Sequence, residues 1–260
     1  MRASKRKKIG VIGTLAVGVL FPILQNRNDN HGEVAMDAPE PVAVERSVET
    51  PPARCLDMTV VDTLMVGDAV FISEPLPPEV LERMKGVSLP QEAEVEVSDL
   101  RYLTLPYYDF EGRVCQGEMV CNVKIAHDLM AVFRDLFVQR YQFCSIRLVD
   151  DFGGSDDASM RANNTSCFNY RRKSGGYALS AHALGLAVDV NPLQNPYVKR
   201  GKAYPENAAD FADRSLDFAH KIDRQDACYK AFVRHGFHWG GSWQGAKDYQ
   251  HFEKGEEATF

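Results

Sequence analysis

Two short segments, residues 180–192 and 239–253, constrain the fold of this 260-residue chain more than any other feature. The first contributes His182 and Asp189, and the second contributes His251. Two imidazoles and a carboxylate suit a divalent metal ion. Two ligands from one segment and a third from a distant one, with the fourth position left to water, are typical of a catalytic rather than a structural zinc ion. We therefore expect the fold to bring the two segments together.

The first segment has the pattern of a β-strand over residues 186–191. Its even-numbered side chains are apolar and would face the core, whereas Asp189 would lie with small and polar neighbours on the face that lines a cleft. Gly185 frees the backbone to turn, so His182 can fold back toward Asp189. Pro192 would end the strand, because proline has no N–H for a ladder.

Further charged side chains complete the predicted site. In a turn or a helix Asp248 can face the same cavity as His251, so we interpret it as the general base that takes a proton from the attacking water and returns it to the leaving amine. Glu253 could orient His251, replace Asp248 as the base, or be an ordinary solvated carboxylate. A positive group is needed near the developing oxyanion. Arg171 and Arg161 are the candidates, with Arg171 favoured because it lies closer to the metal segment.

Other sites that cysteine, histidine and serine residues could form are less well supported by the sequence. None of the six cysteines lies in a CxxC pair, which argues against a structural cysteine site. His235 and His238 lie three apart, but a glycine breaks the helix between them. Ser180 and His182 would lie about 7 Å apart on a strand, too far for a serine nucleophile and its base. We expect Ser180 and Trp243 to contact the substrate instead.

The start of the chain predicts export. Five basic residues among the first eight precede an uncharged run over residues 9–24, which is the pattern of a secretory signal. No clean cleavage site follows, so an uncleaved anchor is favoured over a cleaved signal, with the remaining chain outside the cytoplasm. Residues 1–24 are thus expected to form a signal or anchor. The polar, proline-punctuated residues 25–54 would form a tether, and residues 55–260 the catalytic domain.

The rest of the chain is acidic, because all 36 acidic residues but only 25 of the 30 basic ones follow residue 8. This argues against nucleic acid as a partner, and membrane contact is expected through the amino-terminal segment only. The six cysteines of an exported chain could form disulfides, and their pairing stays open.

Helices and short strands alternate without a regular βαβ rhythm, which predicts an α+β fold. The helical patterns cover residues 77–84, 124–141, 207–222 and 227–235. Strand patterns cover residues 58–61, 144–150, 186–191, 237–239 and 251–253. Residues 152–172 are rich in Gly, Ser, Asp and Asn, and we expect them to form a loop that borders the cleft.

At the two metal segments the chain resembles the VanX/VanY-type zinc D,D-peptidases, part of a wider group with the lysostaphin-like enzymes and the hedgehog signalling domain. The matching motifs are Ser180-x-His182-x-x-Gly185-x-Ala187-x-Asp189 and Asp248-x-x-His251. A third motif, Gly236-Phe237-x-Trp239-Gly240-Gly241-x-Trp243, is similar to VanY-like carboxypeptidases and phage L-alanyl-D-glutamate endolysins. The resemblance covers roughly residues 117–253.

The resemblance implies a small α+β domain with a central antiparallel sheet flanked by helices, one zinc ion, and peptidoglycan stem peptides as substrate. Family members often carry a Ser-Gly-Tyr-Arg segment that supplies the oxyanion arginine. Here the equivalent residues 149–154 read Val-Asp-Asp-Phe-Gly-Gly. The choice between Arg171 and Arg161 therefore stays open.

The expected function is that of a zinc peptidase in the bacterial cell envelope, anchored in the inner membrane or, if the signal is cleaved, secreted. A D-alanyl-D-alanine carboxypeptidase is favoured, and an L-alanyl-D-glutamate-type endopeptidase is the alternative. A non-catalytic module with the same fold, binding the cell wall or a protein, is a further alternative. Asp248 favours an enzyme, because a binding module needs no general base.

Overall fold

The computed structural model describes residues 61–173 and 178–255. The expected anchor at residues 1–24 and the expected tether at residues 25–54 lie outside the described residues, as does nearly all of the expected first strand at 58–61. No helix within the described part of the chain combines the length and the apolar character needed to span a bilayer.

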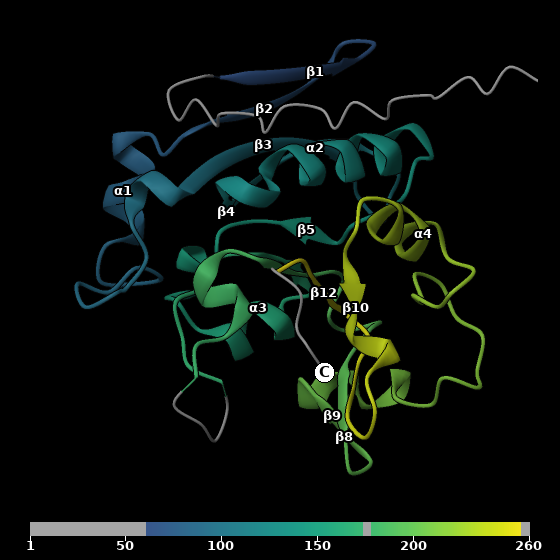
Figure 1. Ribbon diagram of the computed structural model, residues 1–260. Helices are drawn as coiled ribbons and strands as arrows, with labels where there is room; N and C mark the ends of the chain where they lie inside the picture. The colour runs from purple at the N-terminus through teal and green to yellow at the C-terminus, as the bar shows by residue number, and fades with distance from the viewer. Residues whose placement is uncertain (1–60, 174–177, 256–260) are drawn as a thin grey trace, which may run out of the picture. The chain divides into compact units, whose positions relative to one another are not determined.

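The largest sheet has four antiparallel strands in the order β1-β2-β3-β4 (Figure 1). They are β1 (Asp62–Val66), β2 (Ala69–Pro75), β3 (Leu100–Tyr108) and β4 (Val114–Asn122). The sequence patterns did not predict β2, β3 or β4. Helix α1 (Pro78–Met84) and the 3₁₀ helix η1 (Val97–Asp99) lie between β2 and β3. The helix predicted at residues 77–84 is therefore confirmed, with its prolines at the start.

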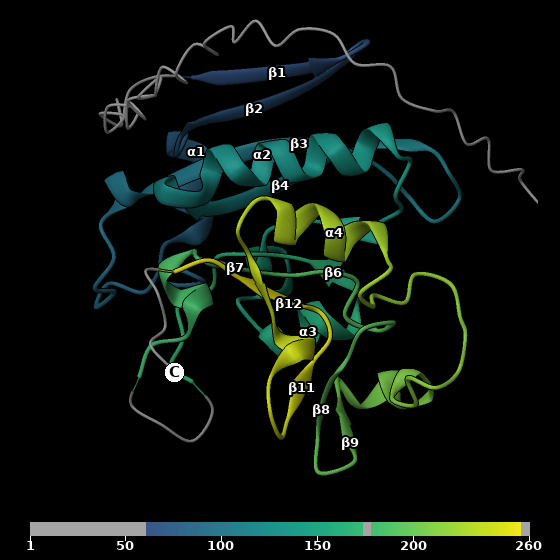
Figure 2. The same ribbon diagram turned by 45° about the vertical axis from the view of Figure 1, so that its right-hand side comes forward.

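Helix α2 (Val123–Val138) is the main packing element, close to the range predicted for it. Its apolar face covers the four-stranded sheet, and Figure 2 shows it running along that sheet. The helix begins at Asn122, whose side chain accepts a hydrogen bond from the backbone N–H of Lys124 at 3.0 Å.

The second half of the described chain is built from shorter elements. Its helices are α3 (Asp156–Arg161), α4 (Ala227–Arg234) and the 3₁₀ helices η2 (Val149–Phe152), η3 (Ala181–Leu184), η4 (Glu206–Phe211) and η5 (Gly240–Ser242). Its strands are β5 (Ser145–Ile146), β6 (Asn164–Thr165), β7 (Ala187–Asp189), β8 (Tyr197–Lys199), β9 (Lys202–Tyr204), β10 (His238–Trp239), β11 (Lys247–Asp248) and β12 (His251–Glu253).

These strands form two antiparallel sheets, ordered β10-β12-β7 and β11-β8-β9, and a parallel pair, β5-β6. Together with the helices they confirm the predicted α+β class. The helix predicted over residues 227–235 is confirmed as α4, and the strands predicted at residues 237–239 and 251–253 are confirmed as β10 and β12.

Three other sequence predictions differ from the structure. The strand expected over residues 144–150 is limited to β5, after which the chain forms η2. The loop expected over residues 152–172 contains α3 and β6. The helix expected over residues 207–222 ends with η4 at Phe211, because the side chains of Arg214 and Asn195 bond the backbone that follows: Arg214 donates to the carbonyl of Ile222 at 2.8 Å and Asn195 to that of His220 at 3.0 Å.

An apolar core connects the large sheet to the site. Phe133 of α2 contacts Phe232 of α4, with ring centroids 6.4 Å apart. Phe232 in turn stacks on Phe252 of β12 at 4.2 Å. Because side chains alternate along a strand, the residues on either side of Phe252 face away from this core. The core therefore fixes the strand that carries His251.

Candidate active site

His251 and Asp189 face each other across two paired strands. The register of β12 and β7 pairs His251 with Asp189 and Phe252 with Val188. Directly paired residues of antiparallel strands point to the same face. The imidazole and the carboxylate therefore share one face, while Phe252 and Val188 lie in the apolar core. Nδ1 of His251 lies 3.1 Å from Oδ1 of Asp189.

His182 reaches the same face from η3. Ser180 precedes this helix, and its hydroxyl accepts a hydrogen bond from the backbone N–H of His182. The helix ends at Gly185, whose φ of +66° lies in the left-handed region that glycine adopts most easily. Nε2 of His182 lies 3.3 Å from Oδ2 of Asp189 and 3.2 Å from Nδ1 of His251.

Two hydrogen bonds from Asn122 connect this turn to the start of α2. Its backbone N–H donates to the carbonyl of Gly185 at 2.8 Å, and its side-chain amide donates to the carbonyl of Leu184 at 3.0 Å. A Cβ at Gly185 would lie 2.6 Å from the backbone nitrogen of Asn122. Only a glycine fits this approach. The buried residue that caps α2 therefore also positions the segment that carries His182.

The second nitrogen of each imidazole has its own acceptor. Nδ1 of His182 lies 2.7 Å from the carbonyl oxygen of Cys167, which can only accept, so Nδ1 carries the proton and Nε2 keeps its lone pair. Nε2 of His251 lies 3.3 Å from Oε2 of Glu253. The hydrogen bond to His251 lowers the pKa of Glu253, which keeps that carboxylate an acceptor. Nδ1 of His251 is thus directed to the cluster.

The three side chains fit a divalent metal ion. One ligand atom from each of His182, Asp189 and His251 lies within 4.8 Å of the others, and all three residues are buried. Burial opposes ionisation of Asp189, but the two imidazoles outweigh it and lower the pKa of this carboxyl. Burial likewise opposes protonation of His251, yet its bonds to Asp189 and Glu253 raise the pKa of the imidazole to about 10. A ligating imidazole must be neutral, so a metal ion would replace that proton.

Asp248 lines the cleft. Within the described residues its Oδ1 is buried and makes no hydrogen bond. Burial, followed by the charge of Asp189, raises the pKa of Asp248 to about 8. Gly240 permits its approach, because a Cβ there would lie 2.7 Å from the carbonyl oxygen of Asp248 and 3.2 Å from Cβ of His251. The carboxylate is therefore available for a proton or a water molecule.

The two candidate arginines have different surroundings. Arg171 lines the cleft, where it forms an ion pair with Asp156 at 2.9 Å and donates to the hydroxyl of Ser180 at 3.4 Å. Its Nε is buried and has no hydrogen-bond partner among the described residues. Arg161 is exposed, pairs with Asp157 at 2.6 Å, and does not line the cleft. The geometry therefore favours Arg171.

The same part of the chain matches a known family. Residues 174–254 match the family model described as D-alanyl-D-alanine carboxypeptidase. This confirms the resemblance found in the sequence, over less than half of the chain, and the match includes His182, Asp189, Asp248 and His251. Searches of curated proteins and of solved structures returned no match. The match indicates a peptidase of the carboxypeptidase type, and the cluster gives it a group that can bind a metal ion.

In this carboxypeptidase-like segment the cluster opens into a cleft of about 800 Å³. Ser180 and Trp243, expected to contact the substrate, both line it. The hairpin of β8 and β9 adds Tyr197, Lys199 and Tyr204 to the lining. The short strands of this hairpin gave no usable pattern, so the sequence did not mark these three residues.

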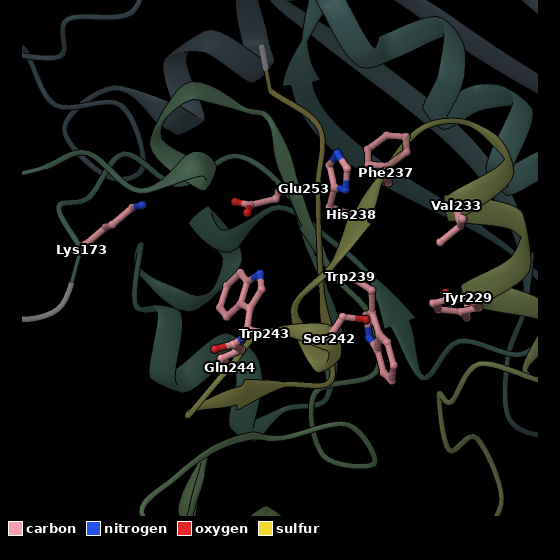
Figure 3. Close-up of a pocket in the computed structure, with 10 residues that line it drawn as sticks. All are labelled: Lys173, Tyr229, Val233, Phe237, His238, Trp239, Ser242, Trp243, Gln244 and Glu253. Atoms are coloured by element: carbon pink, nitrogen blue, oxygen red, sulfur yellow. The ribbon is translucent and has the colours of Figure 1, made fainter. Parts of the chain in front are cut away.

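A second groove, of about 920 Å³, adjoins the cleft and shares Lys173, Trp243 and Glu253 with it. Figure 3 shows Trp243 on one side of this groove and Trp239 with Tyr229 on the other. The ring of Trp243 lies 5.2 Å from that of His251, measured between centroids. Trp243 therefore lies next to the cluster and lines both the cleft and the second groove.

The rival histidines do not join the cluster. Nε2 of His235 lies 3.3 Å from Oδ2 of Asp135, and His238 is exposed on β10. Sequence reasoning also missed Cys167, which holds His182 through a backbone carbonyl that any residue could supply. Cys167 is a free, buried cysteine.

Proposed function

We propose that this chain is a zinc peptidase that removes the terminal D-alanine from peptidoglycan stem peptides. The observation that carries the proposal is the convergence of His182, Asp189 and His251 beside Asp248, within the segment that matches the carboxypeptidase family. The buried Oδ1 of Asp248 has no hydrogen-bond partner among the described residues. Zinc bound to these three side chains would polarise the scissile carbonyl and lower the pKa of a water molecule.

Asp248 serves as the general base and then as the acid. It takes a proton from the attacking water and delivers that proton to the leaving amine as the peptide bond breaks. Its raised pKa of about 8 suits a group that must both accept and donate a proton near neutral pH. A nearby divalent cation would shift this pKa downward, since it favours the charged carboxylate.

Two further side chains prepare the site. Arg171, held by Asp156 and Ser180, places its guanidinium in the cleft, where it stabilises the negative charge that develops on the carbonyl oxygen. Glu253 accepts a hydrogen bond from the N–H at Nε2 of His251 and so keeps Nδ1 available as a ligand.

The proposed location is the bacterial cell envelope. The basic first residues and the uncharged run at residues 9–24 support export with an uncleaved membrane anchor or, after cleavage, secretion. A substrate outside the membrane agrees with that location. The acidic composition of the remaining chain supports a partner other than nucleic acid.

Digestion of purified muropeptides, followed by mass spectrometry, tests the proposal. We expect the loss of one C-terminal alanine, whereas release of the whole stem tail would mean an endopeptidase. Asp248→Asn should keep the metal and lower kcat by about 10²- to 10⁴-fold. Asp157→Asn is the matched control, since Asp157 lines the same cleft but pairs with Arg161. Full turnover in Asp248→Asn would contradict the role of Asp248 as general base, and no turnover by the zinc-loaded wild type would favour a binding module.

A further inference from the structure

A row of side chains leads from Asp248 across the neighbouring hairpin. Strand β8 lies between β11 and β9, and Figure 2 shows the three strands side by side. The register pairs Asp248 with Tyr197, and Tyr197 with Tyr204. Because paired residues point to the same face, the three side chains form a continuous row, and all three line the cleft. The two tyrosine rings lie 6.0 Å apart, measured between centroids.

Lys199 stands beside this row. It lies two residues after Tyr197, so its side chain shares the face of the row. Relative to Asp248 it is the diagonal neighbour, at a typical separation of about 7–8 Å. Lys199 is exposed and lines the cleft, and within residues 61–173 and 178–255 its ammonium group makes no hydrogen bond or ion pair.

Three other cations line the cleft. Arg171 is paired with Asp156, and Arg172 has an interaction of its own. Lys173 lies with Glu253 where the cleft and the second groove meet, because both residues line both cavities. The ammonium group of Lys199 is therefore available to an anionic group of a ligand.

We propose that Lys199 binds the terminal carboxylate of the residue that leaves, and that Tyr197 and Tyr204 form the floor beneath that residue. This inference rests on the proposed function. Asp248 must touch the leaving amine to protonate it, so the leaving residue extends from Asp248. In a single amino acid two bonds separate the amine nitrogen from the carboxylate carbon, and the two atoms lie about 2.5 Å apart. The side chain of Lys199 can span the distance that remains between the hairpin backbone and this carboxylate.

This placement gives the substrate a direction. The leaving residue lies over the hairpin, and the acyl part extends to the opposite side of the metal cluster. Trp243 borders the groove of Figure 3, and no residue of the hairpin lines that groove. A subsite that holds a carboxylate one residue beyond the scissile bond selects peptides that end there, so Lys199 would make the enzyme a carboxypeptidase.

The test compares an acetylated tripeptide that ends in D-Ala-D-Ala with its C-terminal amide, using the zinc-loaded full-length chain. Wild type should prefer the free acid. Lys199→Gln should lower kcat/KM for the acid about tenfold, through KM, and leave the amide unchanged. Lys199→Arg should restore most of the preference. Lys202→Gln is the matched control, since Lys202 pairs with Lys199 in the hairpin but does not line the cleft.

The inference is overturned if Lys199→Gln affects acid and amide alike, or if Lys202→Gln has the same effect, while wild type still cleaves the peptide. If wild type cleaves neither peptide, the proposed function fails. Calorimetric titration of both peptides into the zinc-loaded chain then tests whether Lys199 binds the terminal carboxylate. The inference is supported if wild type binds the acid more tightly than the amide and Lys199→Gln does not. It is rejected if wild type binds acid and amide equally.

Discussion

The regions before and after residue 139 are held together by different means. Residues 62–138 include two nine-residue strands and a 16-residue helix, which pack around apolar side chains. Residues 139–255 contain no described strand longer than three residues, and buried amide side chains connect their turns. The buried asparagines of this region are Asn163, Asn164, Asn169, Asn191 and Asn195. Apolar packing is non-directional, whereas hydrogen bonds fix distance and angle, which is what metal ligands require.

Asn164 illustrates the second kind of support. Its carbonyl oxygen accepts hydrogen bonds from the hydroxyl of Ser145 and the N–H of Arg147, and its amide donates to Arg147 and Ser159. Strand β6, which contains Asn164, leads to Ser166, whose backbone pairs with Asp189. The carboxylate of Asp189 is therefore held by a hydrogen-bond network in addition to the apolar packing of its neighbours Val188 and Val190.

The largest effect is expected where the two regions meet. Gly185→Ala should lower the free energy of unfolding by about 4 kcal/mol, because its Cβ would collide with the backbone of Asn122 and strain a left-handed residue. Gly201→Ala is the control, since Gly201 has a similar φ but open space around it, and it should cost about 1 kcal/mol. Urea unfolding measures both. Equal losses would show that the contact with Asn122 is unimportant.

One substitution in each region distinguishes apolar packing from hydrogen-bonded support. Leu129→Ala, in the fully buried face of α2, should cost about 3 kcal/mol of stability and leave zinc affinity unchanged. Asn164→Ala should cost about 2 kcal/mol, since it leaves buried groups unbonded, and should also weaken zinc binding. Denaturation and competition with a chelator measure the two quantities. The contrast fails if Leu129→Ala weakens zinc binding as much as Asn164→Ala does.

The smallest effect concerns Asp226, which caps α4 by accepting the N–H of Cys228 at 2.8 Å. Burial raises its pKa to about 6, from 3.8. The folded state therefore holds this proton more tightly than the unfolded state, and the stability it contributes is lost as pH rises through 6. Asp226→Asn keeps the cap and removes the charge. Relative to wild type, the free energy of unfolding of the variant should be higher by about 2 kcal/mol at pH 8. At pH 5 this increase should be smaller, by about 1 kcal/mol. Urea midpoints at both pH values measure this, and an equal gain would contradict it.

The residues of the candidate site were easier to predict from the sequence than the strands of the large sheet. His182, Gly185 and Asp189 lie close together in the chain, so their spacing predicts local geometry. Helix α2 was predicted because only one of its faces is buried. Strand β3 was missed because it is buried along most of its length on both faces, which removes the alternation that marks a strand.

The asparagine-rich stretch was misread for a related reason. Asparagine is common in turns, and residues 163–166 therefore predict a loop. Here Asn164 is fully buried and bonded to residues far away in sequence. Such partners cannot be identified from local composition. Lys199 and Tyr197 were missed likewise, because only the pairing of β8 with β11 brings them beside Asp248.

The most direct test of the account is the zinc content of the purified full-length chain, measured by elemental analysis. We expect one zinc ion per chain in wild type and in Asp248→Asn, and less than about a tenth of an ion in His182→Ala and His251→Ala. His238→Ala, which removes an exposed imidazole on β10, should retain the ion. Wild type without zinc, or full zinc content in both His182→Ala and His251→Ala, would contradict the account.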